Sequence, residues 1–581
     1  MLLRNQRIIV SLTALGCAAI IAVLIGWASV PVQPPALAPP SRSAFDARTA
    51  MADTGWFATN HLHRVTGSPG ARRAADALAA AFTALGYRVE RYPFEMWLGG
   101  RRVRGADVVA VWPGAMPESI AILAHADAPT TSPQAAADDA AGIGVLLELA
   151  RVMRDAPHRR TLIFAATDAE EWGMIGAREL AHRLRDQGVA AAISIDDVKA
   201  GDALGLELTC SGQSGGYAPL WLRELLVAAG AANGTPVSQP SGLQEWIDRA
   251  LEVSLQDQGP LLRAGIPAVN VLTIPADRAA ARARYHTPAD VFRGFEPRTF
   301  AMVGGTVERA IAALDAMPAN QAIPARGAGG AGAFLIRPGR YVPALAMRSA
   351  LLLALVPFAL AALLALRNLT GSAQPSRWLH LLAPGIWVIP PYLCVLTLYA
   401  LTAANVLPRY ELYPATPRDP FLYHVSPTVA VPLAAVLVAA IVAVAWTRRR
   451  LPLGRSSFAT RKTALYVWIF AAMAVALAVN AYGAWLMLGV LLLTALLVVR
   501  PAGPGGRGVN ALLLLAAPAP FAALAYLFAQ EIYLGWRISW YLVLQAAYGA
   551  WSPLAVGLAL LAVALWAQAL WTFVVRGRIR A

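Results

Sequence analysis

Lysine is almost absent from this sequence, in which Lys199 and Lys462 are the only two lysines. Charged residues of all kinds make up 14% of the 581 residues, whereas hydrophobic residues make up 57%. This composition excludes a wholly soluble protein. The net charge of +15 comes from arginines that cluster in short loops without a basic stripe of interleaved aromatic residues, so we expect no nucleic-acid partner. The Ala- and Arg-rich, Lys-poor composition is typical of a bacterium with a GC-rich genome.

Cysteine and intramembrane charge are scarce as well. Cys17 and Cys394 lie in apolar runs, and Cys210 is alone in the polar part of the chain, so that part has no internal disulfide. The interiors of the apolar runs in the C-terminal half contain no Asp, Glu, Lys or Arg. Ion-coupled transporters usually keep ionisable residues inside the membrane, so this absence argues against transport.

Long apolar runs occupy both ends of the chain. The first covers residues 8–30, is longer than a signal-peptide core of roughly 7–15 residues, and has no clear cleavage site after it, which favours a retained span. Residues 533–550 are also apolar, and we interpret them as an interfacial or re-entrant segment. Seven further runs are long enough to cross a bilayer, at 349–366, 379–403, 425–446, 463–481, 484–500, 509–529 and 551–575.

Basic residues are distributed unevenly between the loops. With a cytoplasmic N-terminus, the opposite loops carry three arginines, Arg409, Arg418 and Arg537. The cytoplasmic segments then carry fifteen basic residues: Arg4, Arg7, Arg367, Arg377, Arg448, Arg449, Arg450, Arg455, Arg461, Lys462, Arg500, Arg507, Arg576, Arg578 and Arg580. Because cytoplasmic loops are rich in Lys and Arg, this predicts eight spans in a lipid bilayer with both ends cytoplasmic. Residues 31–340 would lie outside, in the periplasm of a bacterium.

The polar part of the chain predicts an α/β domain. Strand-like runs at 107–112, 119–124, 161–166, 191–195 and 268–274 alternate with helical periodicity at 74–86, 138–155, 173–187 and 298–315. This alternation predicts a mixed open sheet with helices on both faces. The whole chain then has five parts: a transmembrane anchor at 1–30, a Pro-rich linker at 31–43, the α/β domain at 44–318, a Gly- and Pro-rich linker at 319–340, and an all-α domain with about seven transmembrane helices at 341–581.

Acidic residues and histidines follow the predicted strands or begin predicted helices. They lie in five segments, AHAD (124–127), AADDAAG (136–142), DAEEWG (168–173), SIDD (194–197) and YHTPAD (285–290). Each segment alone has an ordinary structural explanation, such as a helix cap. In open α/β sheets, however, ligands bind at the carboxyl ends of the strands, so five such segments in one domain indicate one shared site.

The order His, Asp, Glu-Glu, Asp, His resembles the zinc peptidases of family M28, which include aminopeptidases. The resemblance covers roughly residues 55–316 and extends to Gly67–Ser68, to DDAAGIGVLLELAR (138–151), to AEEWGMIGA (169–177) and to RAGIPAV before YHT. The whole layout also resembles the multi-span M28 peptidases of endoplasmic reticulum and vacuolar membranes, which have one N-terminal span, a lumenal peptidase domain and a helical C-terminal domain.

The resemblance implies two zinc ions per chain. Asp138 would bridge the two ions, His125 and Glu171 would bind one of them, and Asp196 and His286 would bind the other. Zinc accepts imidazole nitrogen and carboxylate oxygen, so these residue types suit it. Two zinc ions about 3.5–4 Å apart can share a bridging carboxylate and activate a water molecule.

Three further residues receive roles from the resemblance. Glu170 would be the general base that takes a proton from water and passes it to the leaving amine. Asp127 would orient the imidazole of His125. Asp257 lies where the family has a pocket acid and is our candidate for substrate binding, although an exposed loop acid is an equally good interpretation. The departures from the family pattern, Ala126, Ala136–Ala137 and the stretch 256–258, remove no ligand.

Two other functions remain as alternatives to a membrane-anchored aminopeptidase acting on peptides. Glutaminyl cyclases resemble this family but use one zinc, whereas His125 and Asp196 are both needed only for a second metal. A non-catalytic interaction protein would be expected to have lost ligands, whereas every ligand and the base remain here.

The predicted topology can be tested with reporter fusions. Fusions in the 447–462 loop and at Ala581 should report the cytoplasm, and a fusion near residue 330 should report the opposite side, because the basic residues are asymmetric. An exported C-terminus would contradict the eight-span prediction and favour a ninth span at 533–550.

Overall fold

Eight strands form the sheet of the α/β domain in the order β2-β3-β5-β4-β6-β9-β7-β8. The strands β5, β4, β6 and β9 are parallel neighbours at the centre. Strands β2 and β3 pair antiparallel with their neighbours, whereas β7 pairs antiparallel with β9 and parallel with β8. This confirms the predicted mixed open sheet. The bounds are β2 Arg88–Leu98, β3 Arg101–Trp112, β4 Ser119–His125, β5 Thr161–Thr167, β6 Val189–Ile195, β7 Ala203–Thr209, β8 Val237–Ser238 and β9 Ala268–Pro275.

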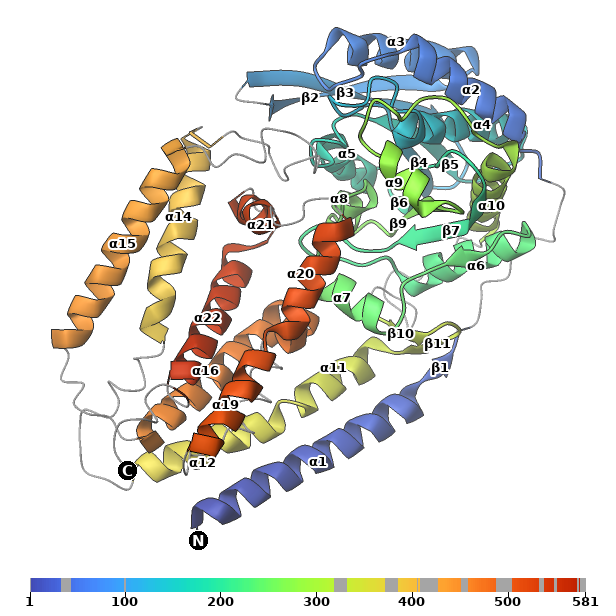
Figure 1. Cartoon of the computed structure of the whole chain (residues 1–581). Helices are drawn as coiled ribbons and strands as arrows, with labels where there is room; N and C mark the ends of the chain where they lie inside the picture. Colours follow the sequence, from blue (N-terminus) through green and yellow to red (C-terminus); the bar gives the residue numbers. More distant parts are fainter. Residues whose placement is uncertain are drawn as a thin grey trace. The chain divides into compact units, whose positions relative to one another are not determined.

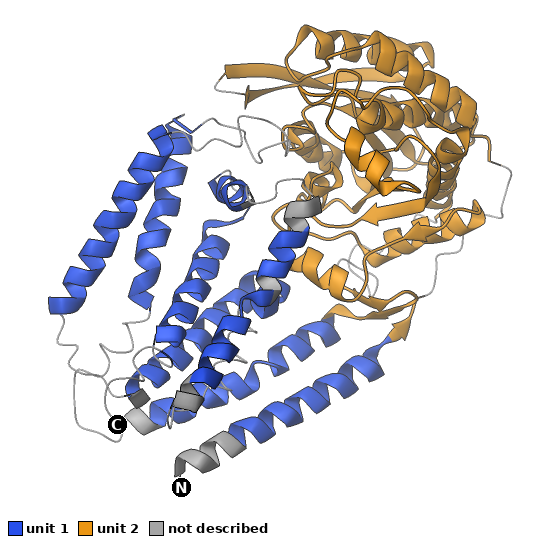
Figure 2. Ribbon diagram, in the orientation of Figure 1, with its two compact units in different colours: residues 1–29, 345–407, 423–581 blue, residues 30–344, 408–422 orange. Residues whose placement is uncertain are grey.

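The structure is a computed structural model. It describes residues 2–32, 43–98, 101–317, 332–370, 385–404, 406–407, 427–450, 458–486, 504–531, 538–547, 551–571 and 574. The chain divides into two compact units (Figure 2). One consists of residues 30–344 and 408–422, and the other of residues 1–29, 345–407 and 423–581.

Helices cover both faces of the sheet because successive strand residues point to opposite sides. In β4, Ile120 and Ile122 belong to one apolar core, whereas Ala121 and Leu123 belong to the other. The first core includes α2 Ala47–Asn60, α3 Pro69–Ala84, α4 Ala141–Asp155, α6 Leu220–Ala232 and α10 Pro297–Ala316, and the second includes α5 Ile175–Asp186 and α8 Gln258–Arg263 (Figure 1). Strands buried on both faces read as continuous apolar runs, which is why the sequence predicted them.

A small second sheet joins two segments that are far apart in the sequence. Strand β1 (Val30–Pro31) pairs antiparallel with β11 (Arg340–Val342), which forms a hairpin with β10 (Phe334–Arg337). Residues 334–340 of this hairpin lie within the segment that the sequence analysis interprets as a linker. Among the described residues, this unit also contains α7 (Leu243–Leu251), α9 (Arg278–Arg284) and the short helical turn η1 (Ala136–Ala140).

The other unit is helical. Among the described residues, six helices are long and apolar enough to cross a membrane. These candidate spans are Ile9–Ala28, Ala344–Arg367, Gly385–Ala403, Pro427–Arg450, Thr460–Val479 and Pro553–Leu570. They belong to α1 (Leu2–Ala28), α11 and α12 (Ala344–Leu353 and Val356–Thr370), η2 and α14 (Gly385–Val388 and Ile389–Ala403), α15 (Pro427–Arg450), α16 (Phe458–Val479) and α22 (Pro553–Leu570).

Two of the eight expected spans are not among these six. The run at 484–500 lies largely outside the described residues. The run at 509–529 is divided between α19 (Pro504–Ala516) and α20 (Ala519–Glu531), with a turn at Ala517–Pro518. Proline lacks the backbone N–H that a helix interior needs, which explains the division at this point. In the segment 533–550, the described helix α21 (Ile538–Ala547) has 10 residues, fewer than the roughly 20 that cross a bilayer.

A substitution in the first apolar core should destabilise the α/β domain. Phe164 of β5 is fully buried, and its ring meets that of Tyr87 edge-on at 5.6 Å. Phe164→Ala should lower the free energy of unfolding by about 3–5 kcal/mol, because it leaves a cavity. Leu204→Ala is the control, since Leu204 is 62% exposed, and should change it by less than about 0.5 kcal/mol. Equal denaturation midpoints for the two variants, measured by protease resistance of the full chain, would contradict this packing.

Candidate metal centre

Three neighbouring parallel strands end at the candidate site. His125 is the last residue of β4, Glu170 and Glu171 lie in the turn after β5, and Asp196 directly follows β6. His125 stands opposite Thr167 in the ladder between β4 and β5, so these ends are level. The central strands therefore carry side chains from three distant parts of the sequence to one edge of the sheet.

Two more side chains come from loops. Asp138 lies in η1 (Ala136–Ala140), directly before α4, and the bond between Asp138 and Asp139 is a cis peptide. His286 follows α9 with a φ of 51°, and the hydroxyl of Thr131 donates to its carbonyl oxygen at 2.9 Å. A positive φ is unfavourable for a residue with a side chain, and such conformations gather at functional sites.

These side chains form one buried cluster. Asp138 accepts from both histidines, with Oδ1 3.0 Å from His125 Nε2 and Oδ2 2.9 Å from His286 Nε2. His286 Nε2 lies 3.2 Å from Glu171 Oε2, and His125 Nε2 lies 3.7 Å from Asp196 Oδ1. His286 thus lies beside Glu171 and His125 beside Asp196, whereas the resemblance pairs His125 with Glu171 and His286 with Asp196. The central place of Asp138 agrees with a bridging role.

The donor set suits metal cations. Ligand atoms of His125, Asp138 and Glu171 lie within 4.8 Å of one another, as do those of His125, Asp139 and Asp196. Each of these side chains is at most 9% exposed. Oε1 of Glu171 and Oδ2 of Asp139 are buried without a hydrogen-bond partner. Unpaired buried carboxylate oxygens beside imidazole nitrogens are the environment that a zinc ion would complete.

Asp139 is a candidate ligand that the sequence analysis did not single out. It is fully buried, and its Oδ1 accepts from the N–H of Gly142 at 2.9 Å. A Cβ at Gly142 would lie 2.1 Å from Asp139 Oδ2, so only glycine leaves room for this carboxylate. The signal was present as the second acid of the DDAAG segment, which a helix cap would also explain.

The charges of the cluster depend on one another. Burial would lower the pKa of His125, but the carboxylates of Asp127, Asp138 and Asp196 raise that pKa well above its ordinary value. Burial would raise the pKa of Asp138, but hydrogen bonds from His125 and His286 lower it overall. The cluster therefore favours positive charge among its carboxylates, which either imidazolium protons or metal ions can supply.

Glu170 borders the cluster without lying at its centre. Its Oε2 is 4.0 Å from His125 Nε2, and the residue is 9% exposed. Burial raises the pKa of Glu170 well above its ordinary value, His125 opposes this shift, and the acids Asp196 and Glu171 add to it. A raised pKa makes a carboxylate a stronger proton acceptor, which suits a group that accepts and returns a proton.

Asp127 ties the two acids to the end of β4. Its two carboxylate oxygens accept from the backbone N–H groups of Glu170 at 3.1 Å and Glu171 at 3.2 Å. Oδ1 also lies 3.4 Å from Nδ1 of His125, but that nitrogen is buried without a hydrogen-bond partner. Asp127 therefore contacts the histidine that it was predicted to orient and also fixes the backbone of the turn after β5.

A second buried acid pair supports the start of that turn. Asp168 accepts from the hydroxyl of Thr66 at 2.7 Å and from the N–H of Ala106 at 3.1 Å, and its own N–H donates to Asp107 Oδ1 at 2.9 Å. Burial raises the pKa of Asp107 well above its ordinary value. The sequence signal for Asp107 was an acid that opens an apolar strand.

Asp257 is buried, so the interpretation as an exposed loop acid is wrong. It is 2% exposed and directly precedes α8. Its Oδ2 accepts from the hydroxyl of Thr167, and its Oδ1 is buried without a partner. Asp257 does not belong to the described residues that line the cavity beside the cluster. Its predicted contact with substrate stays a prediction.

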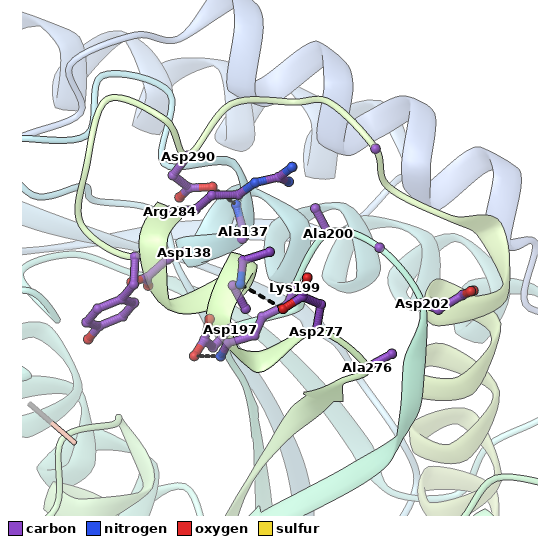
Figure 3. A pocket seen from close by; sticks show the side chains of 15 residues that line it. Ala137, Asp138, Asp197, Lys199, Ala200, Asp202, Ala276, Asp277, Arg284 and Asp290 are labelled. Carbon is purple, nitrogen blue, oxygen red and sulfur yellow. Dashed lines mark hydrogen bonds and ion pairs between the residues drawn. The ribbon is translucent and has the colours of Figure 1, made fainter. Parts of the chain in front are cut away.

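A cavity of about 320 Å³ opens beside Asp138. Figure 3 shows Lys199 paired with Asp197 inside it, Asp290 and Arg284 on one side, and Asp202 and Ala276 on another. Asp290 accepts from the N–H of Ala137 at 2.9 Å. Five carboxylates and two basic groups line this cavity: Asp138, Asp197, Asp202, Asp277 and Asp290 against Lys199 and Arg284.

Comparisons with known proteins find similar sequences and similar folds. An Escherichia coli alkaline phosphatase isozyme conversion protein is 32% identical over 176 residues, which cover 26% of this chain and 50% of that protein. The chain thus spans about half the length of this relative. Among solved structures, the zinc aminopeptidase BSAP of Bacillus subtilis matches at 15% identity with a TM-score of 0.41, covering 47% of this chain and 96% of that one. The glutaminyl cyclase of Porphyromonas gingivalis matches at 21% identity with a TM-score of 0.40, covering 46% of this chain and 97% of that one.

The family comparison covers the segment that holds every candidate ligand. Residues 107–311 match the model of Peptidase family M28, and this range runs from the second half of β3 past β9 and includes both histidines of the cluster. Residues 107–311 of the α/β domain therefore match Peptidase family M28, the family that the order of acids and histidines resembles.

Proposed function

We propose that this chain is a membrane-bound peptidase that holds two zinc ions and removes residues from the amino terminus of peptides. The observation that carries the proposal is the buried cluster of two histidines and several carboxylates at the carboxyl edge of the sheet. The six apolar helices support membrane association.

Asp138 would be shared between the two metal ions. His286 and Glu171 would complete one site, and His125 and Asp196 the other, because these pairs lie closest to each other. When bound, zinc supplies Lewis acidity, which lowers the pKa of water and polarises a peptide carbonyl. Oxygen and nitrogen atoms of the cluster already face one another within 3.7 Å, so the chain needs little rearrangement to hold the ions.

Glu170 would act as the general base. Its carboxylate lies at the edge of the cluster, where it can take a proton from water and return that proton to the leaving amine. The backbone N–H of Glu170 donates to Asp127 Oδ1 at 3.1 Å, which holds this residue of the turn beside the cluster. Because Glu170 is not needed as a ligand, its charge can change during the reaction without loss of a metal.

The cavity supports a preference for a free amino terminus. Its carboxylates outnumber its basic groups, and Lys199 is matched by Asp197. A cationic α-amine entering beside Asp138 would therefore be attracted, whereas an acetylated terminus would lose that attraction.

Removing the metal and substituting Glu170 should distinguish zinc binding from peptide hydrolysis. A chelator should abolish hydrolysis, and metal analysis should find about two zinc ions per chain. Glu170→Gln should keep both ions and lower kcat by about 10²–10⁴-fold, because a base is lost and a ligand is not. The measurement is metal content together with peptide hydrolysis by the purified full chain.

His125→Ala is the matched comparison for Glu170→Gln. It should lose zinc as well as activity, because His125 contacts both Asp138 and Asp196. A fully active Glu170→Gln variant would show that another group is the base.

The preference for a free amine can be measured with one peptide in two forms. The free peptide should be cleaved from its amino terminus, and its N-acetylated form should be cleaved at least tenfold more slowly. Equal cleavage of both forms would indicate an endopeptidase or a carboxypeptidase. Cyclisation of an N-terminal glutamine without cleavage of a peptide bond would indicate a glutaminyl cyclase.

A further inference from the structure

Arg64 is a fully buried arginine close to the candidate metal centre. It lies between α2 and α3, outside the segment that matches the family model. Burying a guanidinium is unfavourable unless its N–H groups form hydrogen bonds, so the hydrogen-bond partners of a fully buried arginine indicate its role.

The guanidinium of Arg64 joins the two chain segments that carry His125 and Asp138. Its Nε donates to the carbonyl of Ala126 at 2.8 Å, directly after His125. Its Nη1 donates to the carbonyl of Gln134 at 2.7 Å, and its Nη2 to that of Ala135 at 3.1 Å. Ala135 immediately precedes the turn that holds Asp138.

Two further contacts hold the guanidinium in place. Nη1 also donates to the carbonyl of His61 at 3.0 Å, and the ring of Phe57 lies 4.7 Å from the guanidinium carbon. Burial lowers the pKa of Arg64 to about 10, so the group stays charged at neutral pH. None of the hydrogen bonds described for Arg64 goes to a carboxylate, so its positive charge remains available to the acids nearby.

We propose that Arg64 is a positioning residue of the metal centre, which fixes the separation of His125 and Asp138 by bridging the backbones beside them. The proposal rests on the proposed metal centre. His125 Nε2 and Asp138 Oδ1 are 3.0 Å apart, and no backbone–backbone hydrogen bond described for this part of the chain joins residues 124–127 to residues 134–138. The planar guanidinium of arginine has several N–H donors at fixed angles and can bond to two chain segments at once, whereas the ammonium of lysine places its donors on one atom.

Arg160 provides a matched control in the same domain. It is fully buried, and its Nη1 donates to the carbonyls of Leu314, Asp315 and Met317 at 2.8–2.9 Å. It directly precedes β5, at the opposite end of that strand from the candidate ligands. Its Nε and Nη2 donate to Glu118 Oε2 at 2.9 and 2.7 Å, so substituting Arg160 removes a buried guanidinium and an ion pair without touching the metal centre.

The experiment compares Arg64→Gln, Arg64→Lys, Arg160→Gln and Arg160→Lys in the purified full-length protein. Zinc affinity is measured by competition with a chelator, thermal stability is measured without metal, and kcat and KM are measured with one peptide. Arg64→Gln should weaken zinc binding by about 10–100-fold, as expected for residues that orient ligands. It should lower kcat more than it raises KM, and Arg64→Lys should fall between it and the wild type. Both Arg160 variants should lose thermal stability and keep wild-type zinc affinity.

Two outcomes would overturn the proposal: an Arg64→Gln variant with zinc affinity within threefold of the wild type, or Arg160 variants that weaken zinc binding as much as the Arg64 variants do. If the glutamine variants do not fold, the two lysine variants test the proposal. Arg64→Lys should then bind zinc at least threefold more weakly than the wild type, and Arg160→Lys should bind zinc as the wild type does. A wild-type chain that binds zinc without cleaving peptides would refute the proposed function, and the affinity comparison would still test Arg64.

Discussion

Electrostatic repulsion between buried carboxylates is the constraint on which the site depends. Asp138, Asp139, Glu170, Glu171 and Asp196 are each at most 9% exposed and gather around two histidines. Two like charges 4 Å apart repel by about 4 kcal/mol even at an effective dielectric constant of 20, so such a cluster needs cations or protons. The histidines contact Asp138 at 2.9–3.0 Å and meet part of this need. Divalent zinc would meet it more fully, and the same positive charge would serve hydrolysis.

Hydrogen bonds to the backbone hold these mutually repelling carboxylates in place. Asp127 accepts the N–H groups of Glu170 and Glu171, and Arg64 donates to the carbonyls on both sides of the gap between His125 and Asp138. At Gly176 a Cβ would lie 2.2 Å from Asp107 Oδ1, so glycine lets that acid reach the turn after β5. Asp127, Arg64 and Asp107 are all buried, which keeps ligand geometry fixed before a metal arrives.

The helical unit follows a simpler rule. In lipid every backbone polar group must be satisfied within the segment, so apolar length by itself predicts a helix. Six of the eight expected runs accordingly contain candidate spans. The run at 509–529 differs because it contains a turn at Pro518, where a helix cannot continue its hydrogen bonds.

The sequence by itself determined the residue types of the centre, the central strands and the α/β class. Apolar runs and helical periodicity are local properties, and the segments with acids and histidines could be recognised one by one. Only the tertiary structure decided which ligand lies beside which, since the contact of His286 with Glu171 depends on how a loop after α9 folds over the end of β5. It likewise decided that Asp257 is buried and that Arg64 and Asp139 adjoin the site. Such contacts join residues far apart in the chain, and no local pattern specifies them, because packing of the whole domain sets the distance between strand ends.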